Sequence, residues 1–331
     1  PLFRRGRGLT NRPHALGDGN VELDDCCTTF RLHVATIGTV NGMLEYLAYR
    51  AAAAFFGVLP EPLMRTIGRA LGRVAFTRAG RRRNMAIRHM ARALGSEAEI
   101  ELAAKEAFAA YGRYWAEVFW VRPRRVPGIL NRISVEGLDR VKAAQASGLG
   151  MIYVLPHIGN WEVAGSVAHD LGLELIAAAE DLPNPRLARW FADVRKSFGI
   201  DVVFAGGGHN VVGRLTEGLR RGAAVALVMD RNVGDGGIQV EFLGEQTELP
   251  GGAAALAIRL NVPVFPVAAY FKKGAGHRVV IEPAVDIPAA GPDRVAVGTR
   301  HIAEALERLI RRDPTQWHIL QPNWPSDRPT P

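Results

Sequence analysis

The stretch Met151-Ile-Tyr-Val-Leu-Pro-His-Ile-Gly-Asn-Trp-Glu162 contains an apolar run, a proline and a turn in close succession. The run 151–155 is typical of a buried strand, and Pro156 ends it. Gly159 and Asn160 form a turn, with Asn160 at the expected N-cap of the helix that follows. The sequence therefore predicts a corner at which a strand turns into a helix.

This corner brings a histidine and a carboxylate within reach of each other. On a single helix, His157 and Glu162 would point roughly 140° apart. Across the corner, His157 leaves the end of the strand and Glu162 lies in the first turn of the helix, so the two side chains can meet. A carboxylate beside an imidazole fixes its tautomer and stabilises its protonated form, which suits a general base. A lone histidine is otherwise more often a structural residue.

Apolar runs and amphipathic segments alternate along most of the 331 residues, which are enough for a substantial core. Strands are expected at 133–136, 151–155, 173–178, 200–204, 223–229, 262–270 and 278–281. Helices are expected at 43–59, 63–76, 99–121, 139–146, 163–171, 183–198, up to 221, 252–260 and 294–311. The pattern predicts an α/β fold: an open, mainly parallel sheet flanked by helices on both faces, with an N-terminal amphipathic helical segment.

The net charge of +8 is concentrated in this N-terminal segment. Residues 43–125 carry 15 basic and 7 acidic side chains, whereas 126–331 carry 21 and 22. Arginines recur in the segment at positions 65, 69, 73, 81–83, 88 and 92. A basic amphipathic segment can lie on an anionic membrane, although the same surface also suits the solvated face of a helical bundle. Binding of nucleic acid is not expected, because there is no recognition motif.

The first 42 residues differ from the rest, being rich in glycine, arginine, asparagine and aspartate without sustained periodicity. We expect 1–42 to be a poorly ordered extension or an upstream translation artefact. The segment 43–125 is then membrane-facing, and 126–331 is the catalytic α/β core, with 43–331 as one structural domain. The two cysteines are adjacent, so no disulfide framework is expected. No apolar run reaches the roughly 18–20 residues that span a bilayer.

The segment His157-Ile-Gly-Asn-Trp-Glu162 resembles the His-x4-Asp/Glu signature of bacterial glycerolipid and lipid A acyltransferases. The residues Gly159-Asn-Trp161 within this motif are most similar to those of the lauroyl/myristoyl lipid A acyltransferases and of their actinobacterial relatives, the phosphatidylinositol mannoside acyltransferases. Glu162 stands where many of the mannoside enzymes have aspartate, which leaves the acceptor open. The C-terminal segment 316–324 also resembles the end of the family, with His318 expected to be structural.

Two further motifs match the family near the expected active site. Arg195 lies in 190–199, which resembles a helix ending in Arg-x-x-x-Gly whose arginine serves the active site. Asp230 and Arg231 follow the strand 223–229, and Asp230 resembles the acidic residue that the family keeps near its histidine. The structural alternatives are a surface arginine near a helix C-terminus and an aspartate that caps a loop.

A third motif, Gln239–Gly252, resembles a block that precedes a helix in the family and offers Glu241 and Glu245 as candidates. Taken together, the resemblance implies catalytic roles for His157, Glu162 and Asp230. It implies substrate contacts for Asn160, Trp161, Arg195, Arg231, Glu241 and Glu245. It implies no metal and no other cofactor.

The reaction implied by the resemblance moves a fatty acyl chain from acyl-CoA or acyl carrier protein to a hydroxyl of a membrane glycolipid, such as a phosphatidylinositol mannoside. His157 would remove the hydroxyl proton. Glu162 would orient the ring of His157, and Asp230 would help to orient it. The enzyme would lie peripherally on the cytoplasmic face of the plasma membrane, against anionic lipid. The alternatives are a lysophospholipid or lipid A-type acyltransferase with another acceptor, and a non-catalytic lipid-binding protein of the same fold.

Overall fold

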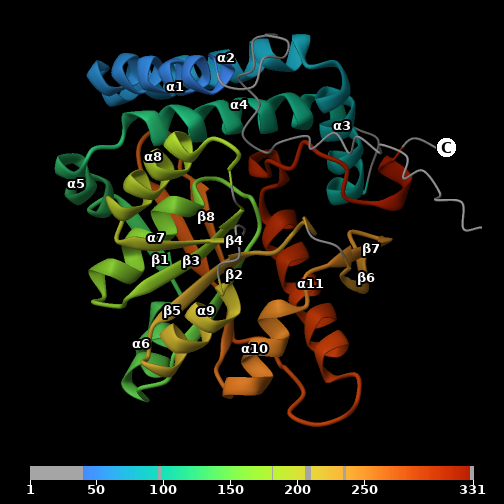
Figure 1. Ribbon diagram of the computed structural model, residues 1–331. Coiled ribbons are helices and arrows are strands. Elements are labelled where there is room, and N and C mark those ends of the chain that lie inside the picture. Colours follow the sequence, from blue (N-terminus) through green and yellow to red (C-terminus); the bar gives the residue numbers. More distant parts are fainter. Residues whose placement is uncertain (1–39, 96–98, 181, 206–209, 234–235, 329–331) are drawn as a thin grey trace, which may run out of the picture. The chain divides into compact units, whose positions relative to one another are not determined.

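The computed structural model describes residues 40–95, 99–180, 182–205, 210–233 and 236–328 (Figure 1). Of the expected N-terminal extension, residues 1–39 lie outside this part of the chain. Helix α1 begins at Val40, shortly before the expected start at Met43. All described residues belong to one compact unit.

A seven-stranded sheet with the order β1-β9-β8-β2-β5-β3-β4 forms the centre of the fold. Its strands are β1 Ile133–Glu136, β2 Met151–Leu155, β3 Leu175–Glu180, β4 Ile200–Ala205, β5 Ala224–Val228, β8 Val264–Phe271 and β9 His277–Ile281. Strand β9 is antiparallel to β8 and parallel to β1, and the other neighbours are parallel. The predicted open, mainly parallel sheet is therefore confirmed, and its central strand β2 is buried throughout.

Helices cover both faces of the sheet, as predicted. Leu175 and Ile176 are adjacent in β3, so their side chains point to opposite faces. Leu175 faces Gly165, and Ile176 faces Gly218. These two glycines belong to α7 (Trp161–Asp170) and α9 (Val211–Arg220), which therefore lie on opposite faces. The other helices that pack around the sheet are α5 Val126–Leu130, α6 Leu138–Ala146, α8 Pro185–Lys196, α10 Gly252–Leu260 and α11 Arg294–Arg312.

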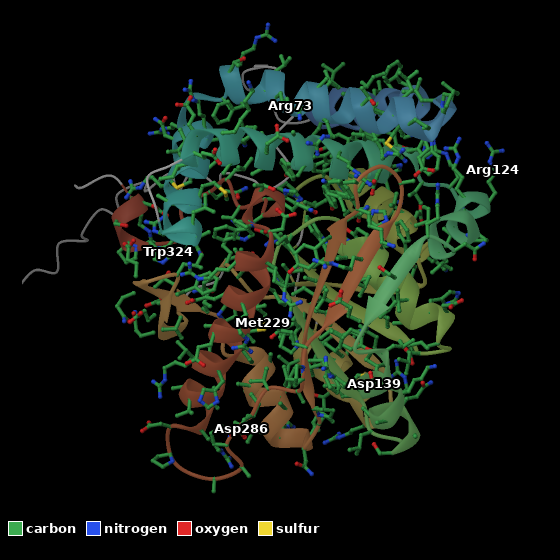
Figure 2. All side chains as sticks on the ribbon, turned by 180° about the vertical axis from the view of Figure 1, so that it is seen from behind. Arg73, Arg124, Asp139, Met229, Asp286 and Trp324 are labelled. Carbon is green, nitrogen blue, oxygen red and sulfur yellow. The ribbon has the colours of Figure 1, made fainter. Side chains whose placement is uncertain are left out.

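The N-terminal helices form a layer across one end of the sheet (Figure 1). They are α1 Val40–Val58, α2 Glu61–Arg78, α3 Gly80–Leu94 and α4 Ile100–Trp120. Figure 2 shows Arg73 in this layer and Asp139 and Asp286 at the opposite end. Gly72 of α2 lies against the backbone of α4 with no room for a side chain, so the two helices are in backbone contact. None of the described helices is both long enough and apolar enough to cross a bilayer.

The expected basic face of α2 is mostly neutralised within the layer. Arg65 pairs with Glu61. Arg69 and Arg73 both pair with Glu106 of α4, at 2.6 and 2.9 Å. The stripe therefore ties α2 to α4. Association of the basic segment with an anionic membrane stays a prediction.

The segment Gln239–Gly252 forms an antiparallel hairpin, which the sequence reading missed. Its strands are β6 Ile238–Phe242 and β7 Glu245–Leu249, joined at Leu243 and Gly244. Both turn residues have positive φ, of 53° and 82°. Glycine favours this conformation, whereas leucine adopts it rarely, so Leu243-Gly244 is a weak hairpin signal. Helix α10 begins immediately after the hairpin, at Gly252.

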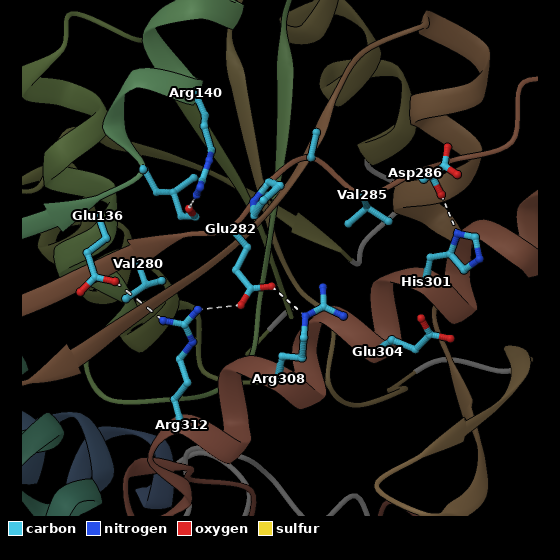
Figure 3. Close-up of a pocket in the computed structure, with 14 residues that line it drawn as sticks. Glu136, Arg140, Val280, Glu282, Val285, Asp286, His301, Glu304, Arg308 and Arg312 are labelled. Carbon is cyan, nitrogen blue, oxygen red and sulfur yellow. Dashed lines mark hydrogen bonds and ion pairs between the residues drawn. The ribbon is translucent and has the colours of Figure 1, made fainter.

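A cavity of about 600 Å³ opens at the end of the sheet where β1 and β9 finish (Figure 3). Because β9 is antiparallel to β8, this is the amino edge of the parallel strands, away from His157. Its buried Glu282 already pairs with Arg308 at 3.1 Å and with Arg312 at 3.0 Å. The charge of Glu282 is thus neutralised within the wall of the cavity.

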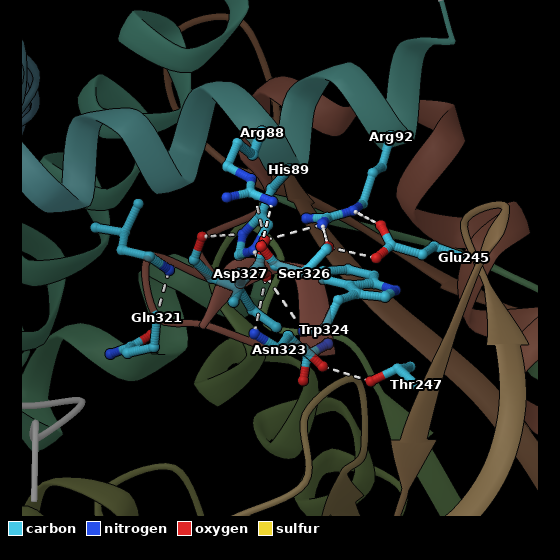
Figure 4. Close-up of polar contacts among 12 residues, drawn as sticks. Arg88, His89, Arg92, Glu245, Thr247, Gln321, Asn323, Trp324, Ser326 and Asp327 are labelled. Atoms are coloured by element: carbon cyan, nitrogen blue, oxygen red, sulfur yellow. Dashed lines mark hydrogen bonds and ion pairs between the residues drawn. The ribbon is translucent and has the colours of Figure 1, made fainter. Parts of the chain in front are cut away.

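The C-terminal segment is bound to α3 through a buried carboxylate (Figure 4). Asp327 accepts hydrogen bonds from Arg92 at 2.8 Å and from the backbone amide of Asn323 at 3.0 Å, and it faces His89 Nε2 at 3.3 Å. The other ring nitrogen of His89 lies 2.9 Å from the carbonyl of Ile319. Burial alone would raise the pKa of Asp327, but these bonds outweigh it and hold the pKa well below its ordinary value.

We expect Asp327→Asn to lower the free energy of unfolding by about 3 kcal/mol at pH 7, because it removes the buried carboxylate that faces His89 and accepts from one nitrogen of Arg92. Since the pKa of Asp327 is depressed in the folded protein, its contribution is complete above about pH 4 and is lost as the pH falls further. Urea denaturation of both proteins at pH 7 and at pH 3 measures this. The exposed control Asp170→Asn should change stability by less than about 0.5 kcal/mol. An Asp327→Asn protein as stable as the parent at pH 7 would contradict the assignment.

Candidate active site

The carboxyl edge of the sheet brings His157 and Asp230 together from two neighbouring strands. Leu155 ends β2 and lies opposite Val228, which ends β5. One residue separates His157 from the end of β2, and one residue separates Asp230 from the end of β5. Both side chains therefore emerge at the same edge of the sheet. His157 Nδ1 lies 2.6 Å from Asp230 Oδ1, and the backbone amide of His157 donates to Asp230 Oδ2 at 2.8 Å. The two residues thus form a doubly bonded pair.

Asp230 is fully buried, and its second partner comes from the C-terminal segment. Trp317 Nε1 donates to Asp230 Oδ2 at 2.8 Å. Burial by itself would raise the pKa of Asp230, but the charge and hydrogen bonds of His157, with Trp317, hold it below its ordinary value. The carboxylate is therefore ionised at neutral pH and accepts the Nδ1 proton of His157. This arrangement leaves Nε2 of His157 as the basic nitrogen.

The structure corrects the expected role of Glu162. We expected Glu162 to orient His157, but its carboxylate instead accepts from Arg195 Nε, at 3.1 Å to each oxygen. Tyr114 of α4 lies 3.4 Å from the same carboxylate. Glu162 is buried in the first turn of α7 and is directed toward α8, which carries Arg195. The orienting partner of His157 is therefore Asp230, and Glu162 fixes the guanidinium of Arg195.

The aromatic ring of Trp161 packs against the ring of His157. Its ring lies edge-on to His157, with centroids 5.3 Å apart and an interplanar angle of 82°. The ring also stacks on Tyr114 of α4, with centroids 4.2 Å apart. Asn160, in contrast, is buried, and its side chain does not cap α7 but binds Glu117 of α4. Asn160 occupies the N-cap position of α7, as expected, but its side chain makes no capping hydrogen bond. Its expected contact with substrate stays a prediction.

Two arginines lie around the carboxyl edge. Arg195 is partly exposed beside Glu162. Arg231 follows β5 and lies 3.3 Å from Glu180, the last residue of β3. Both guanidinium groups therefore lie at the edge that carries His157, each paired with a carboxylate.

The hairpin carboxylates have other surroundings. Glu245 accepts from Arg92 Nε at 2.8 Å and from Ser326, so it binds the hairpin to α3 and the C-terminal segment (Figure 4). Glu241 is exposed on β6, opposite Gln246. Glu245 thus joins three parts of the chain, and Glu241 lies on the outer side of the hairpin. Substrate contact by either residue stays a prediction.

Several residues of the site escaped the sequence reading because they lie far away in the chain. Trp317 holds Asp230, Tyr114 supports Trp161, and Asn323 donates to the carbonyl of Asp230 at 3.0 Å. His318 is structural, as expected. Burial lowers the pKa of His318 to about 3, so its neutral ring donates to the carbonyl of Gly159 at 3.0 Å. The resemblance of 316–324 to the family end was the one signal that pointed to this segment.

Comparison with known proteins identifies the family to which the chain belongs. A sequence profile of the family described as bacterial lipid A biosynthesis acyltransferase matches residues 41–326. A phosphatidylinositol mannoside acyltransferase of Mycobacterium tuberculosis (strain ATCC 25618 / H37Rv) is 35% identical over 221 residues, which cover 66% of this chain and 68% of the relative.

A second relative extends the similarity over more of the chain. The phosphatidylinositol mannoside acyltransferase of Mycolicibacterium smegmatis is 30% identical over 292 residues, 87% of this chain and 94% of the relative. The matched region includes the corner at His157, the strand that leads to Asp230 and most of the C-terminal segment that holds both. The chain therefore belongs to the bacterial lipid A biosynthesis acyltransferase family and is an acyltransferase.

Proposed function

We propose that the protein transfers a fatty acyl chain from a thioester donor, acyl-CoA or acyl carrier protein, to a hydroxyl of a phosphatidylinositol mannoside. Family membership supports acyl transfer to a glycolipid. The names of the two mycobacterial relatives support the mannoside as acceptor. The observation that carries the mechanism is the 2.6 Å contact between His157 and the buried Asp230, which leaves the other ring nitrogen available as a base.

In the proposed reaction, Nε2 of His157 takes the proton of the acceptor hydroxyl while the oxygen attacks the thioester carbonyl. The tetrahedral intermediate then collapses, the carbon–sulfur bond breaks, and the thiolate takes the proton from the imidazolium. Asp230 keeps the ring in the productive tautomer and stabilises its positive charge between these steps. Both substrates are bound together, and no acyl-enzyme forms.

Arg195 and Arg231 supply the positive charge that the substrates require. The donor and the acceptor both carry phosphate groups, and the carbonyl oxygen becomes negative during attack. A guanidinium held in place before the reaction stabilises such charge without reorganisation. We propose that Glu162 holds Arg195 for this purpose, on the basis of its bonds to the guanidinium. Trp161 would then border the acceptor, because it flanks His157.

Thiol release from palmitoyl-CoA tests the proposed function. We expect release that depends on a mannosylated phosphatidylinositol and that falls at least about 10³-fold in His157→Ala, because the base is removed. The same assay is run with lysophospholipid and lipid A-type acceptors, and with acyl carrier protein in place of CoA as the carrier of the donor. Release with another acceptor alone would identify that alternative. Equal behaviour of parent and His157→Ala with every donor and acceptor would favour a lipid-binding protein without catalysis.

The two carboxylates near His157 should differ sharply in their effects. We expect Asp230→Asn to lower kcat by about 10³–10⁴-fold, because an amide favours the wrong tautomer of the ring. Glu162→Gln should cost only about 10–100-fold, since it loosens Arg195 and leaves the base intact. Steady-state thiol release and the thermal midpoints of both variants measure this. The opposite order of effects would restore Glu162 as the partner of His157.

We further propose peripheral association with anionic lipid on the cytoplasmic face of the plasma membrane. The support is the outer surface of α1 and α2, where large apolar side chains are solvent-exposed: Met43, Leu44, Leu47, Phe55, Val58, Leu63, Leu71 and Val74. An exposed apolar face of this kind suits insertion into a membrane interface. Because the arginine stripe of α2 is engaged with Glu61 and Glu106, insertion of apolar side chains would dominate the attachment.

Vesicle sedimentation tests the attachment. We expect the double variant Leu47→Ser/Phe55→Ser to bind phosphatidylinositol-containing vesicles at least about tenfold more weakly, because two inserting side chains are lost. Leu149→Ser removes an exposed leucine outside the N-terminal layer and serves as the control. Binding of the parent should persist at about 0.5 M salt, where charge attraction is screened. Loss of binding in salt together with normal binding of the double variant would contradict apolar insertion.

A further inference from the structure

A third buried carboxylate, Glu117 of α4, lies beneath the corner that carries His157. Its Oε1 accepts from Arg113 Nε at 2.8 Å. Its Oε2 accepts from Asn160 Nδ2 at 2.8 Å and lies 2.9 Å from His277 Nε2. The three partners come from α4, from the corner and from the first residue of β9. Glu117 therefore connects the helical layer, the sheet and the corner that carries His157.

Glu117 is a permanently charged acceptor. Burial by itself would raise its pKa, but the charges and hydrogen bonds of His277 and Arg113, together with Asn160, lower the pKa to about 2. The carboxylate is consequently ionised throughout the neutral range. A hydrogen bond from an amide to a charged acceptor is shorter and stronger than one to a neutral group. Asn160 is thus held more firmly than an ordinary N-cap would be.

Stability alone accounts poorly for this network. Within the described part of the chain, Asn160 Oδ1, His277 Nδ1 and Arg113 Nη2 are buried without a hydrogen-bond partner. An incompletely satisfied buried ionic network is a weak source of stability, and an apolar replacement of similar shape is often as stable. The network does, however, fix the position of the Asn160 side chain, which is its one member from the corner.

The position of Asn160 determines how the corner is bent. Its backbone amide donates to the carbonyl of Ala269 in β8 at 2.9 Å, and its side chain turns away from α7 to reach Glu117. His157 lies on one side of this point, at the end of β2, and Glu162 lies on the other, in α7. The same helix α4 also supports the corner through Tyr114, which stacks on Trp161.

We propose that Glu117 is a positioning residue for acyl transfer, which sets the relative placement of the His157–Asp230 pair and the Glu162–Arg195 pair by holding Asn160. The proposal rests on the proposed function for its kinetic consequence. It does not require Glu117 to touch substrate, because both Glu117 and Asn160 are buried. The expected signature is therefore a loss in kcat with little change in KM.

The test compares Glu117→Gln and Asn160→Ala with the control Glu106→Gln. Glu106 lies on the same helix and pairs with Arg69 and Arg73, so it matches the loss of charge without reaching the corner. We expect kcat to fall about 10–100-fold in each of the first two variants, with KM for donor and acceptor within about twofold. Because both act through one contact, the double variant should lose little more than either single variant.

A second readout needs no substrate. Diethyl pyrocarbonate acylates the basic ring nitrogen of histidine, and mass spectrometry follows the reaction at His157. We expect faster modification of His157 in Glu117→Gln and in Asn160→Ala than in the parent, because the corner is held less firmly, and no change in Glu106→Gln. Absence of transfer by the parent would refute the proposed function alone, while the modification rates would still decide the role of Glu117.

Each outcome bears on the proposal. If Glu117→Gln does not fold, Asn160→Ala carries the comparison, since it removes the same contact and leaves Glu117 with both of its basic partners. Unchanged kcat and unchanged modification rates in folded variants would overturn the positioning role. Additive losses in the double variant, or a change in KM alone, would also overturn it.

Discussion

The hydrogen bond between His157 and the buried Asp230 is the interaction on which the candidate site depends. It exists because β2 and β5 are parallel neighbours whose carboxyl ends are in register. It is strong because Asp230 is removed from water and also receives hydrogen bonds from the backbone amide of His157 and from Trp317. A carboxylate in this setting both selects the tautomer of the ring and stabilises the imidazolium that proton transfer creates. The sheet thus determines the chemistry at its edge.

Two distant parts of the chain hold this edge in place. The C-terminal segment supplies Trp317 and the backbone bond from His318 to His157, and it is anchored in turn to α3 through Asp327. Helix α4 reaches the same corner from the other direction through Tyr114 and Glu117. The helical layer therefore supports the catalytic geometry, and its outer surface of α1 and α2 is left for the proposed contact with lipid. The helical layer would then both attach the protein to the membrane and align the residues of the site.

The sequence predicted the sheet well because its strands are continuous apolar runs, such as 151–155, and these need no partner to be recognised. The motifs picked out His157, Glu162 and Asp230, but they did not give the pairings of these residues. They also missed the distant contacts of Trp317 and Tyr114. His157 and Glu162 are neighbours in sequence, yet the bond to His157 comes from Asp230, because strand register decides the contact and register is a tertiary property. For the same reason, the arginines of α2 could not be matched to Glu106, and the bond from the Asn160 side chain to Glu117 could not be foreseen.

Proton NMR of the protein labelled with ¹⁵N-histidine tests the central claim most directly. A proton held between His157 Nδ1 and a buried carboxylate gives a strongly downfield resonance that no substrate is needed to observe. We expect this resonance to be present in the parent and in Glu162→Gln and absent in Asp230→Asn, with the other histidine signals unchanged. A resonance that survives in Asp230→Asn and disappears in Glu162→Gln would contradict it.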